Sequence, residues 1–510
     1  MERTKTEVNA INLPVAETGV AGLDVILRGG LLANRLYLIG GDPGSGKTTI
    51  ALQFLRAGVK RGERCMFVAL SETEDELRAT AASHGWSLDG ISIFSISPTE
   101  ESLTSDSRYT MYHPSEVELF ETTKAVLAEA ERVKPSRLVF DSLSELRLLA
   151  ENPLRYRRQV LALKQFFARQ QCTVVFITDR TGENSDMELQ SIAHGVIAVE
   201  RHSSEYGAMR RRLQIVKQRG REFQGGYHDL VIRRGGVEVF PRLVASERPN
   251  TFPRGLISSG LQSLDDLLGG GLEKGTSTLL LGASGTGKSA VATQYAMAAA
   301  GRGEHSTLFL FDENLRTFVE RSTGLGMDVR PVLESGRMIV RQVDPAELTP
   351  GEFAQIVRKA VEQEQTRLVV IDSLNGYLNA MPTERFLTLH LHELLSYLGQ
   401  QGVTTLLLMA QHGIVGHPMQ TPVDASYLAD TVLLLRYFEA MGEVRQAISV
   451  IKKRTGPHER TIRELRFSSR GVTVGEPLRE FQGVLGGTPQ YVGEHFNGVE
   501  HHDGLDKPGP

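Results

Sequence analysis

The sequence predicts two tandem α/β domains, each a mostly parallel sheet flanked by helices. The chain has 510 residues, more than one domain usually holds. It also repeats itself: the glycine-rich pattern of residues 18–48 returns at 259–289, which gives a repeat of roughly 235 residues, the size of a whole domain. Within each half, short continuous apolar runs such as 36–39 and 174–177 alternate with longer helical patterns. Continuous runs are typical of strands buried on both faces of a parallel sheet.

The repeat sets the expected domain bounds. We expect an N-terminal domain over residues 1–245 and a C-terminal domain over 246–485, because the polar, proline-containing stretch 246–250 separates the two copies. Residues 486–510 are rich in Gly, His and Pro and predict a flexible tail. His495, His501 and His502 lie in this tail, where an unstructured segment is favoured over a metal site.

Composition narrows the class of protein. The formal net charge is only -4, so no overall basic field favours nucleic acid or membranes. Two cysteines, Cys65 and Cys172, exclude a disulfide framework, suit a reducing compartment and are expected to be buried in strands. The sequence has neither an apolar run of membrane-spanning length nor a signal-peptide core, so we expect a cytoplasmic protein.

Two G-x-x-x-x-G-K-[ST] motifs each follow a predicted strand and precede a predicted helix. Their glycines let backbone N–H groups face phosphate oxygens, the lysines would reach the β- and γ-phosphates, and the hydroxyls of Thr48 and Ser289 would ligate Mg²⁺. The lack of an N-K-x-D motif favours ATP over GTP. The predicted ATP-binding loop residues are Gly41, Asp42, Pro43, Gly44, Ser45, Gly46, Lys47, Thr48 and Thr49 in the first half, and Gly282, Ala283, Ser284, Gly285, Thr286, Gly287, Lys288, Ser289 and Ala290 in the second.

Acidic residues end further strands in both halves. Asp141 and Asp372 each close an apolar strand, and we expect them to bind ATP through Mg²⁺ as metal-site residues. Glu72 and Glu313 each stand 25 residues after the lysine of their loop. A carboxylate beside the γ-phosphate can position and deprotonate the attacking water, so both are candidate catalytic residues; the alternative is a solvated loop acid or helix cap.

These residues resemble the KaiC family, the RecA-like clock ATPases with two fused ATPase domains. The resemblance runs from about residue 18 to 486 and includes both phosphate loops and both Asp-Ser strand ends. It implies a homohexameric ring with nucleotide between subunits, where a neighbour contributes a Lys-x-Arg pair to the phosphates. Lys217 with Arg219, and Lys452 with Arg454, match that pair; a solvated basic strand is the alternative reading.

The chain departs from the family's tandem Glu-Glu. The first half has Ser71-Glu72 and the second has Asp312-Glu313, so the resemblance implies that Glu72 acts alone or that the first domain hydrolyses more slowly, while Asp312 can still act as a base. The family also autophosphorylates adjacent Ser and Thr residues. Ser426 occupies the serine position, but Tyr427 replaces the threonine, which leaves a one-site autokinase as the expectation.

The expected function is therefore ATP binding and hydrolysis, with serine/threonine autokinase activity, in a hexameric regulatory or timing switch that uses Mg²⁺. The resemblance also implies a regulatory protein partner at the C-terminal tail. Two alternatives stay open. One is a RecA-like DNA-binding ATPase, favoured by the basic helix that starts at Arg155 but disfavoured by the acidic net charge. The other is a regulatory scaffold that binds ATP structurally.

Overall fold

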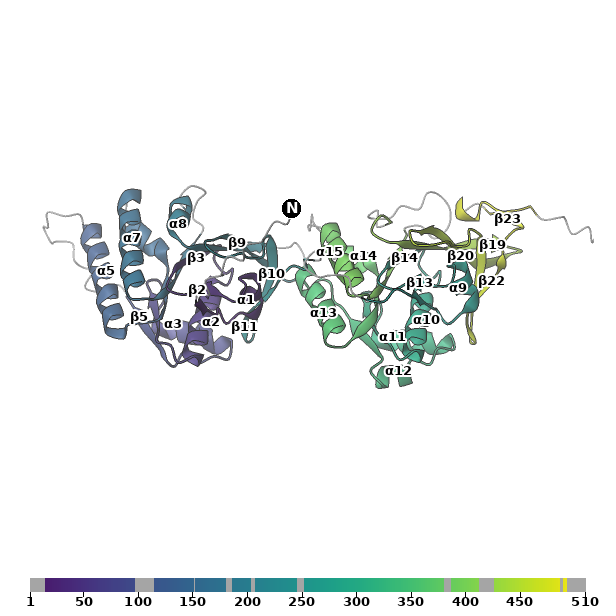
Figure 1. Ribbon diagram of the computed structural model, residues 1–510, viewed down its shortest axis with the longest axis horizontal. Helices are drawn as coiled ribbons and strands as arrows, with labels where there is room; N and C mark the ends of the chain where they lie inside the picture. Colours follow the sequence, from purple (N-terminus) through teal and green to yellow (C-terminus); the bar gives the residue numbers. More distant parts are fainter. Residues whose placement is uncertain are drawn as a thin grey trace, which may run out of the picture. The chain divides into compact units, whose positions relative to one another are not determined.

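The computed structural model describes residues 14–96, 114–150, 152–179, 186–202, 207–244, 252–379, 387–411, 426–486 and 489–492. Contacts within the chain group it into two compact units: Met1–Arg242 with Glu347–Gln355, and Leu243–Ala346 with Ile356–Pro510. Figure 1 colours the chain along its sequence, so the first unit runs from purple to teal apart from its green segment Glu347–Gln355, and the second runs from teal to yellow. Each unit is described by itself.

The first unit contains, among its described residues, a nine-stranded sheet in the order β11-β10-β9-β8-β3-β7-β6-β4-β5. Strands β8, β3, β7, β6, β4 and β5 are parallel, and β9, β10 and β11 extend the sheet antiparallel from β8. The strands are β3 (Leu36–Gly41), β4 (Cys65–Ala69), β5 (Ile91–Ser95), β6 (Arg137–Asp141), β7 (Thr173–Asp179), β8 (Gly195–His202), β9 (Arg210–Gln218), β10 (Tyr227–Arg233) and β11 (Gly236–Phe240). A separate hairpin joins β1 (Val15–Ala16) to β2 (Leu31–Leu32).

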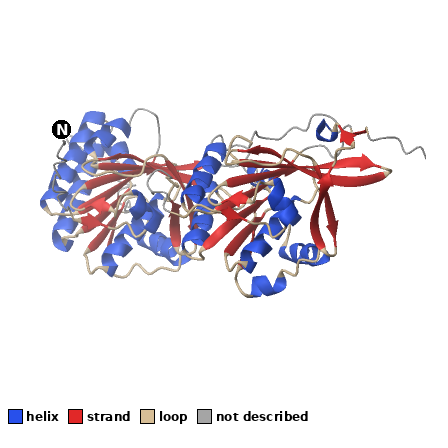
Figure 2. Ribbon diagram, turned by 45° about the vertical axis from the view of Figure 1, so that its right-hand side comes forward, coloured by secondary structure: helices blue, strands red, loops and turns tan. Residues whose placement is uncertain are grey.

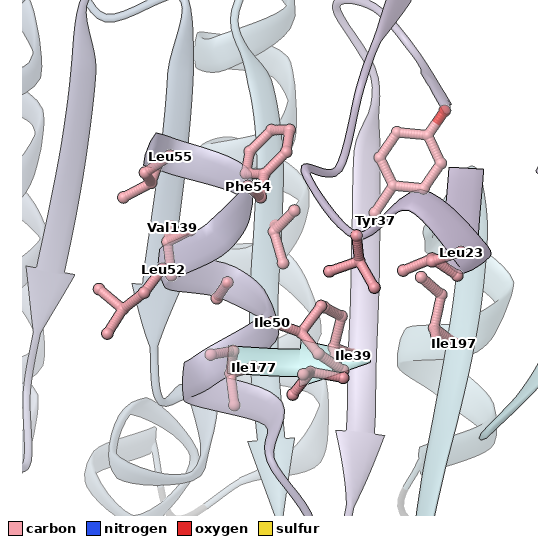
Figure 3. Packing of buried hydrophobic residues seen from close by; sticks show 14 of the residues in the cluster. Leu23, Tyr37, Ile39, Ile50, Leu52, Phe54, Leu55, Val139, Ile177 and Ile197 are labelled. Atoms are coloured by element: carbon pink, nitrogen blue, oxygen red, sulfur yellow. The ribbon is translucent and has the colours of Figure 1, made fainter. Parts of the chain in front are cut away.

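Helices cover both faces of this sheet, as the helix and strand colours of Figure 2 make visible. They are α1 (Ala21–Ile26), α2 (Lys47–Lys60), α3 (Glu74–Ser83), α5 (Pro114–Val133), α6 (Leu143–Ala150), α7 (Pro153–Arg169) and α8 (Asp186–Ile192). The apolar residues of β3 explain the two-sided cover. Tyr37 and Ile39 point into the core under α1 and α2 (Figure 3), whereas Leu36 and Leu38 point into the core under α5 to α8.

The second unit repeats this plan. Its described residues form a nine-stranded sheet in the order β16-β15-β17-β18-β14-β19-β20-β21-β22, parallel from β16 to β19 and antiparallel beyond. The strands are β14 (Ser277–Gly282), β15 (His305–Leu310), β16 (Met338–Gln342), β17 (Thr366–Asp372), β18 (Thr404–Ala410), β19 (Thr431–Ala440), β20 (Glu443–Lys453), β21 (Arg463–Ser468) and β22 (Gly471–Pro477). Short strands β12 (Leu256–Ile257) and β13 (Leu272–Glu273) form a hairpin.

The helices of the second half are α9 (Gln262–Leu267), α10 (Lys288–Gly301), α11 (Leu315–Gly324), α12 (Arg330–Glu334), α13 (Pro350–Glu362), α14 (Leu374–Asn379) and α15 (Leu387–Gln400). After β22, the strands β23 (Phe481–Gln482) and β24 (Gln490–Tyr491) pair with each other around a 3-10 turn, Val484–Gly486. Phe481 and Val484 pack with Phe438 of β19 in a small separate cluster.

The predicted fold class, two α/β domains with mostly parallel sheets, is confirmed. Cys65 lies in β4 and Cys172 directly precedes β7; both are buried and unpaired, so their expected burial is confirmed. Burial raises the pKa of the Cys65 thiol to about 12, so it is a structural residue and not a reactive one. No helix in the described parts of the chain is long and apolar enough to cross a membrane. The histidines of the predicted tail lie outside the described residues.

Candidate nucleotide sites

Both phosphate loops lie where the topology predicts, at the carboxyl end of a central parallel strand. The first loop connects β3 to α2 and the second connects β14 to α10, and each helix begins at the loop lysine. All the predicted loop residues belong to these two segments. Gly46 and Gly287 precede the helices with φ of 104° and 97°. A Cβ at Gly287 would come within 1.9 Å of Phe467, so both the backbone angle and the space require glycine.

The loop lysines are held in the same way in both halves. The Lys47 ammonium donates to the carbonyls of Gly41 at 3.0 Å and Asp42 at 2.8 Å. Lys288 donates to the carbonyls of Gly282 at 2.8 Å and Ala283 at 2.7 Å. Each ammonium therefore lies in the concave side of its loop, where backbone N–H groups and the helix N-terminus favour phosphate.

One charge distinguishes the two loops. Lys47 also forms an ion pair with Asp179, the last residue of β7, at 2.9 Å. Asp179 lies opposite Gly41 in the sheet, and the residue opposite Gly282 in the second half is Ala410. Lys288 has no such carboxylate at the matching position, and burial lowers its pKa to about 8 although Asp372 opposes the shift. Asp179 was not among the residues predicted from the sequence, although the difference between the two strand ends distinguishes it.

A hydroxyl and a carboxylate meet beside each loop. Thr48 Oγ1 donates to Asp141 Oδ2 at 2.8 Å, and Ser289 hydrogen-bonds Asp372. Burial raises the pKa of Asp141 to about 6, an effect that the Thr48 hydrogen bond reduces and the charge of Glu72 increases. Burial likewise raises the pKa of Asp372. In each half, the hydroxyl and the desolvated carboxylate are hard oxygen ligands. This pair fits Mg²⁺.

The two candidate catalytic acids have different surroundings. Glu72 follows β4, and its Oε2 is buried with no hydrogen-bond partner among the described residues. Burial, and to a lesser extent Glu76, raises its pKa. Its counterpart Glu313 accepts two hydrogen bonds from Arg321 of α11, at 3.0 Å from Nε and 2.9 Å from Nη2. The adjacent Asp312 accepts a hydrogen bond from the Ser373 hydroxyl.

The Lys-x-Arg pairs lie away from their own loops. In the first sheet Lys217 is level with Val196 and hence with Leu38, three residues before Gly41. In the second, Lys452 is level with Val432 and Leu279, again three residues before the glycine that opens the loop. Three residues of strand span about 10 Å. Arg219 and Arg454 donate their backbone N–H groups to the residues directly before β8 and β19, so each pair lies toward the amino ends of the parallel strands, whereas the loop follows a carboxyl end.

The same irregularity precedes both pairs. Between β8 and β9, and again between β19 and β20, the register shifts by one residue, which leaves Val216 and Ile451 as the extra residues of two β-bulges. Both extra residues are about half exposed, at 46% and 50%. A bulge redirects the side chains that follow it, and it is frequent beside functional sites. The sequence carried no sign of these bulges.

The cations of each pair bind carbonyl oxygens of the segment that enters the neighbouring strand. Lys217 donates to the carbonyls of Gln190 at 2.6 Å and Ala193 at 2.9 Å, and Arg219 to that of Ser191 at 3.1 Å. In the second half the acceptors are the carbonyls of Ser426 (2.7 Å from Lys452), Ala429 (2.8 Å from Lys452) and Tyr427 (2.8 Å from Arg454). Ser426 is exposed, and the hydrogen bond from Lys452 places it at the same end of the sheet as Lys452 and Arg454.

Two phosphate loops, each with a hydroxyl–carboxylate pair and a strand-end acid, define the chain as a tandem P-loop NTPase. The family model for the KaiC ATPase matches residues 16–244 and 257–479. The chain therefore belongs to the KaiC ATPase family.

Three relatives illustrate the distance within the family. The chain is 29% identical to the circadian clock protein KaiC3 of Synechocystis sp., over 96% of this chain and 97% of the relative. It is 26% identical to the circadian clock oscillator protein KaiC of Synechococcus elongatus, over 96% and 95%. The KaiC of Acaryochloris marina is 25% identical over 96% and 94%. The similarity thus covers both halves.

Proposed function

We propose that the protein binds and hydrolyses ATP at both loops and works as a hexameric ring in which each site is completed by a neighbouring subunit. One observation supports the ring. In both halves the Lys-x-Arg pair follows the same β-bulge and lies toward the amino ends of the parallel strands, away from its own phosphate loop. A cation pair that faces away from its own loop can serve the loop of another copy, where it would stabilise charge on the transferred phosphoryl.

Within one site, this chain's residues divide the work. The loop backbone and Lys47 or Lys288 bind the phosphates, while Thr48 with Asp141, or Ser289 with Asp372, would hold Mg²⁺, which neutralises phosphate charge when bound. Glu72 in the first half and Glu313 in the second position the attacking water and accept its proton. The water oxygen bonds to the γ-phosphorus while the bond between that phosphorus and the ADP oxygen breaks, and ADP leaves with the electron pair of the broken bond.

We further propose that Ser426 accepts a phosphoryl group from the ATP of a neighbouring subunit. Its backbone carbonyl is bound by Lys452, so the acceptor and the cations would reach the neighbour's phosphates together. The Ser426 hydroxyl oxygen would attack the γ-phosphorus, ADP would leave, and Asp312 or Glu313 of the neighbouring copy would take the proton. Slow phosphorylation of this kind suits a regulatory or timing role, which the names of the relatives support.

The remaining parts of the proposal concern location and partners. Two buried free thiols suit the reducing cytoplasm. A protein partner would bind at the C-terminal end, beyond the β23–β24 pair. If the protein is instead a DNA-dependent motor, single-stranded DNA will stimulate its turnover, and the stimulation will fall steeply with salt.

The test measures native mass and ATP turnover together. We expect ATP-dependent hexamers, loss of one site's turnover in Lys47→Ala and of the other's in Lys288→Ala, and turnover lost in Lys217→Ala and Lys452→Ala without loss of ATP binding. With γ-labelled ATP, label should appear on wild type and disappear in Ser426→Ala. Equal turnover in wild type and the Lys47→Ala/Lys288→Ala double variant would defeat the site assignment, and label unchanged in Ser426→Ala would remove Ser426.

A further inference from the structure

The second half has an arginine beside its catalytic acid that the first half lacks. Arg321 on α11 binds both oxygens of Glu313 through Nε and Nη2. Both side chains are largely shielded from water, with 26% of Arg321 and 20% of Glu313 exposed. The guanidinium also stacks on Phe318, 5.5 Å from the ring centre, so its position is fixed from two sides.

The corresponding position in the first half is occupied by a residue that cannot form this pair. Arg321 stands eight residues after Glu313, and the residue eight positions after Glu72 is Thr80 on α3. Thr80 is half buried, as Arg321 is, so the two positions occupy comparable surroundings. Glu72 keeps a buried carboxylate oxygen with no partner among the described residues, whereas both oxygens of Glu313 are engaged.

A general base needs a free lone pair directed at water. A bidentate arginine occupies lone pairs of both carboxylate oxygens and orients the carboxylate toward the helix. Arg321 also lies close enough to the metal-site acid that its charge counteracts the effect of burial on the pKa of Asp372. The pair therefore lies beside the reacting centre and not at a remote surface.

We propose that Arg321 is a positioning residue that restrains Glu313 and thereby slows ATP hydrolysis at the second site, while the first site, with Thr80, has no such restraint. This inference rests on the proposed hydrolysis at both sites. Ser71, which stands where the family has an acid, suggested that the first domain hydrolyses ATP more slowly than the second. The restraint on Glu313 implies the opposite order of hydrolysis rates, with the first domain faster. A second site that spares its ATP from water would keep the γ-phosphoryl for a hydroxyl acceptor.

The experiment uses full-length protein with one site silenced. In a Lys47→Ala background, where turnover comes from the second site, Arg321→Gln removes the charge but keeps a stem to pack on Phe318. We expect kcat to rise roughly fivefold to tenfold while KM for ATP changes less than about twofold, since the restraint acts on the base and not on ATP. Adding Glu313→Gln should abolish the gain, and Arg321→Lys, which keeps the charge but not the bidentate geometry, should give a smaller one.

The reciprocal change tests the same idea in the other half. In a Lys288→Ala background, Thr80→Arg should lower kcat at the first site by a similar factor, and Thr80→Met, which adds bulk without charge, should not. An unchanged or lowered kcat in Arg321→Gln would overturn the restraint; if that variant does not fold, the Thr80→Arg and Thr80→Met pair decides. If only the restraint proposal is wrong, Lys47→Ala and Lys288→Ala each keep partial ATP turnover. If the proposed function itself is wrong, the Lys47→Ala/Lys288→Ala double variant turns over ATP as fast as wild type.

Discussion

The ammonium of Lys47 lies 2.9 Å from a carboxylate oxygen of Asp179, and the pair closes the first phosphate loop against the end of β7. Lys47 is nearly buried, with 6% of its side chain exposed, while Asp179 is 34% exposed. A triphosphate that needs Lys47 must compete with this carboxylate and also meets its negative charge. The second loop has Ala410 at the matching position, so the two sites differ in what ATP has to displace.

We predict that Asp179→Asn strengthens ATP binding at the first site. Because Asp179 is partly solvated, the ion pair contributes about 1 kcal/mol, which corresponds to a dissociation constant about fivefold lower. The measurement is a titration with a fluorescent ATP analogue in the Lys288→Ala background. The control is Ala410→Asn in the Lys47→Ala background, which removes no charge and should bring no gain. Weaker binding in Asp179→Asn would mean that this carboxylate supports the nucleotide or its metal.

We predict that Glu72→Gln removes hydrolysis at the first site but keeps ATP bound. The substitution preserves shape and removes the basic oxygen, and general base catalysis typically contributes about a hundredfold or more. ADP release is measured in the Lys288→Ala background together with ATP affinity, which should change less than about twofold. Ser71→Ala, at the exposed neighbouring position, is the control and should keep most of the activity. Turnover that survives Glu72→Gln would assign the base to another group.

Arg137 and Arg367 illustrate how far the sequence could predict the structure. Both precede Leu-Val in the strand that ends at Asp141 or Asp372, so sequence comparison pairs them. Arg137 is four residues before Asp141, however, and Arg367 is five before Asp372. Side chains alternate along a strand, so one residue changes the face. Arg137 is accordingly 1% exposed and lies opposite Cys65, whereas Arg367 is exposed.

Features that depend on a local motif could be predicted, because the residues of each motif determine the local backbone conformation themselves. The loops, the strand-end acids and the alternation of strands and helices belong to this class. Other features depend on partners outside the motif. The Lys47–Asp179 pair joins residues distant in the chain, and the Glu313–Arg321 pair joins a strand-end acid to a later turn of α11. The two bulges depend on the register between neighbouring strands. A single sequence holds no direct sign of such partners, and comparison of the two halves is the best substitute for it.

We predict that Arg137→Met destabilises the first domain by about 1 to 3 kcal/mol, because the buried Phe54 carbonyl loses a donor. Glu63 is 31% exposed, so water can solvate its freed carboxylate. Arg137 donates to Glu63 and to the carbonyl of Phe54 at 2.9 Å, and it lies over the Phe54 ring. Calorimetry measures the unfolding transitions of the two domains. Trp86, the chain's one tryptophan, packs in the core of the first unit, so a parallel fluorescence melt shows which transition belongs to that domain. The exposed Arg367→Met should shift the second transition by less than about 0.5 kcal/mol. Comparable shifts for the two variants would contradict the difference in burial.

His228 predicts how the stability of the first domain depends on pH. Its Nδ1 accepts the Arg242 N–H at 3.0 Å and its Nε2 lies 3.1 Å from the Gln224 carbonyl, so the buried ring is neutral with the proton on Nε2. Burial lowers the pKa of His228 to about 4. Between this value and the ordinary pKa near 6.5, the unfolded chain binds a proton that the folded domain does not, so folding stability falls as the pH drops.

The expected loss from this group between pH 7 and pH 5 is about 2 kcal/mol, and it grows until the pH reaches about 4. Urea unfolding followed by Trp86 fluorescence at pH 7, 6 and 5 measures it. His228→Gln lowers stability at pH 7 but should remove this part of the slope, so that the difference from wild type shrinks as the pH falls. His202→Gln, at a histidine with 53% of its side chain exposed, should leave the slope as it is. A difference between wild type and His228→Gln that stays constant from pH 7 to pH 5 would show that this ring does not couple protonation to folding.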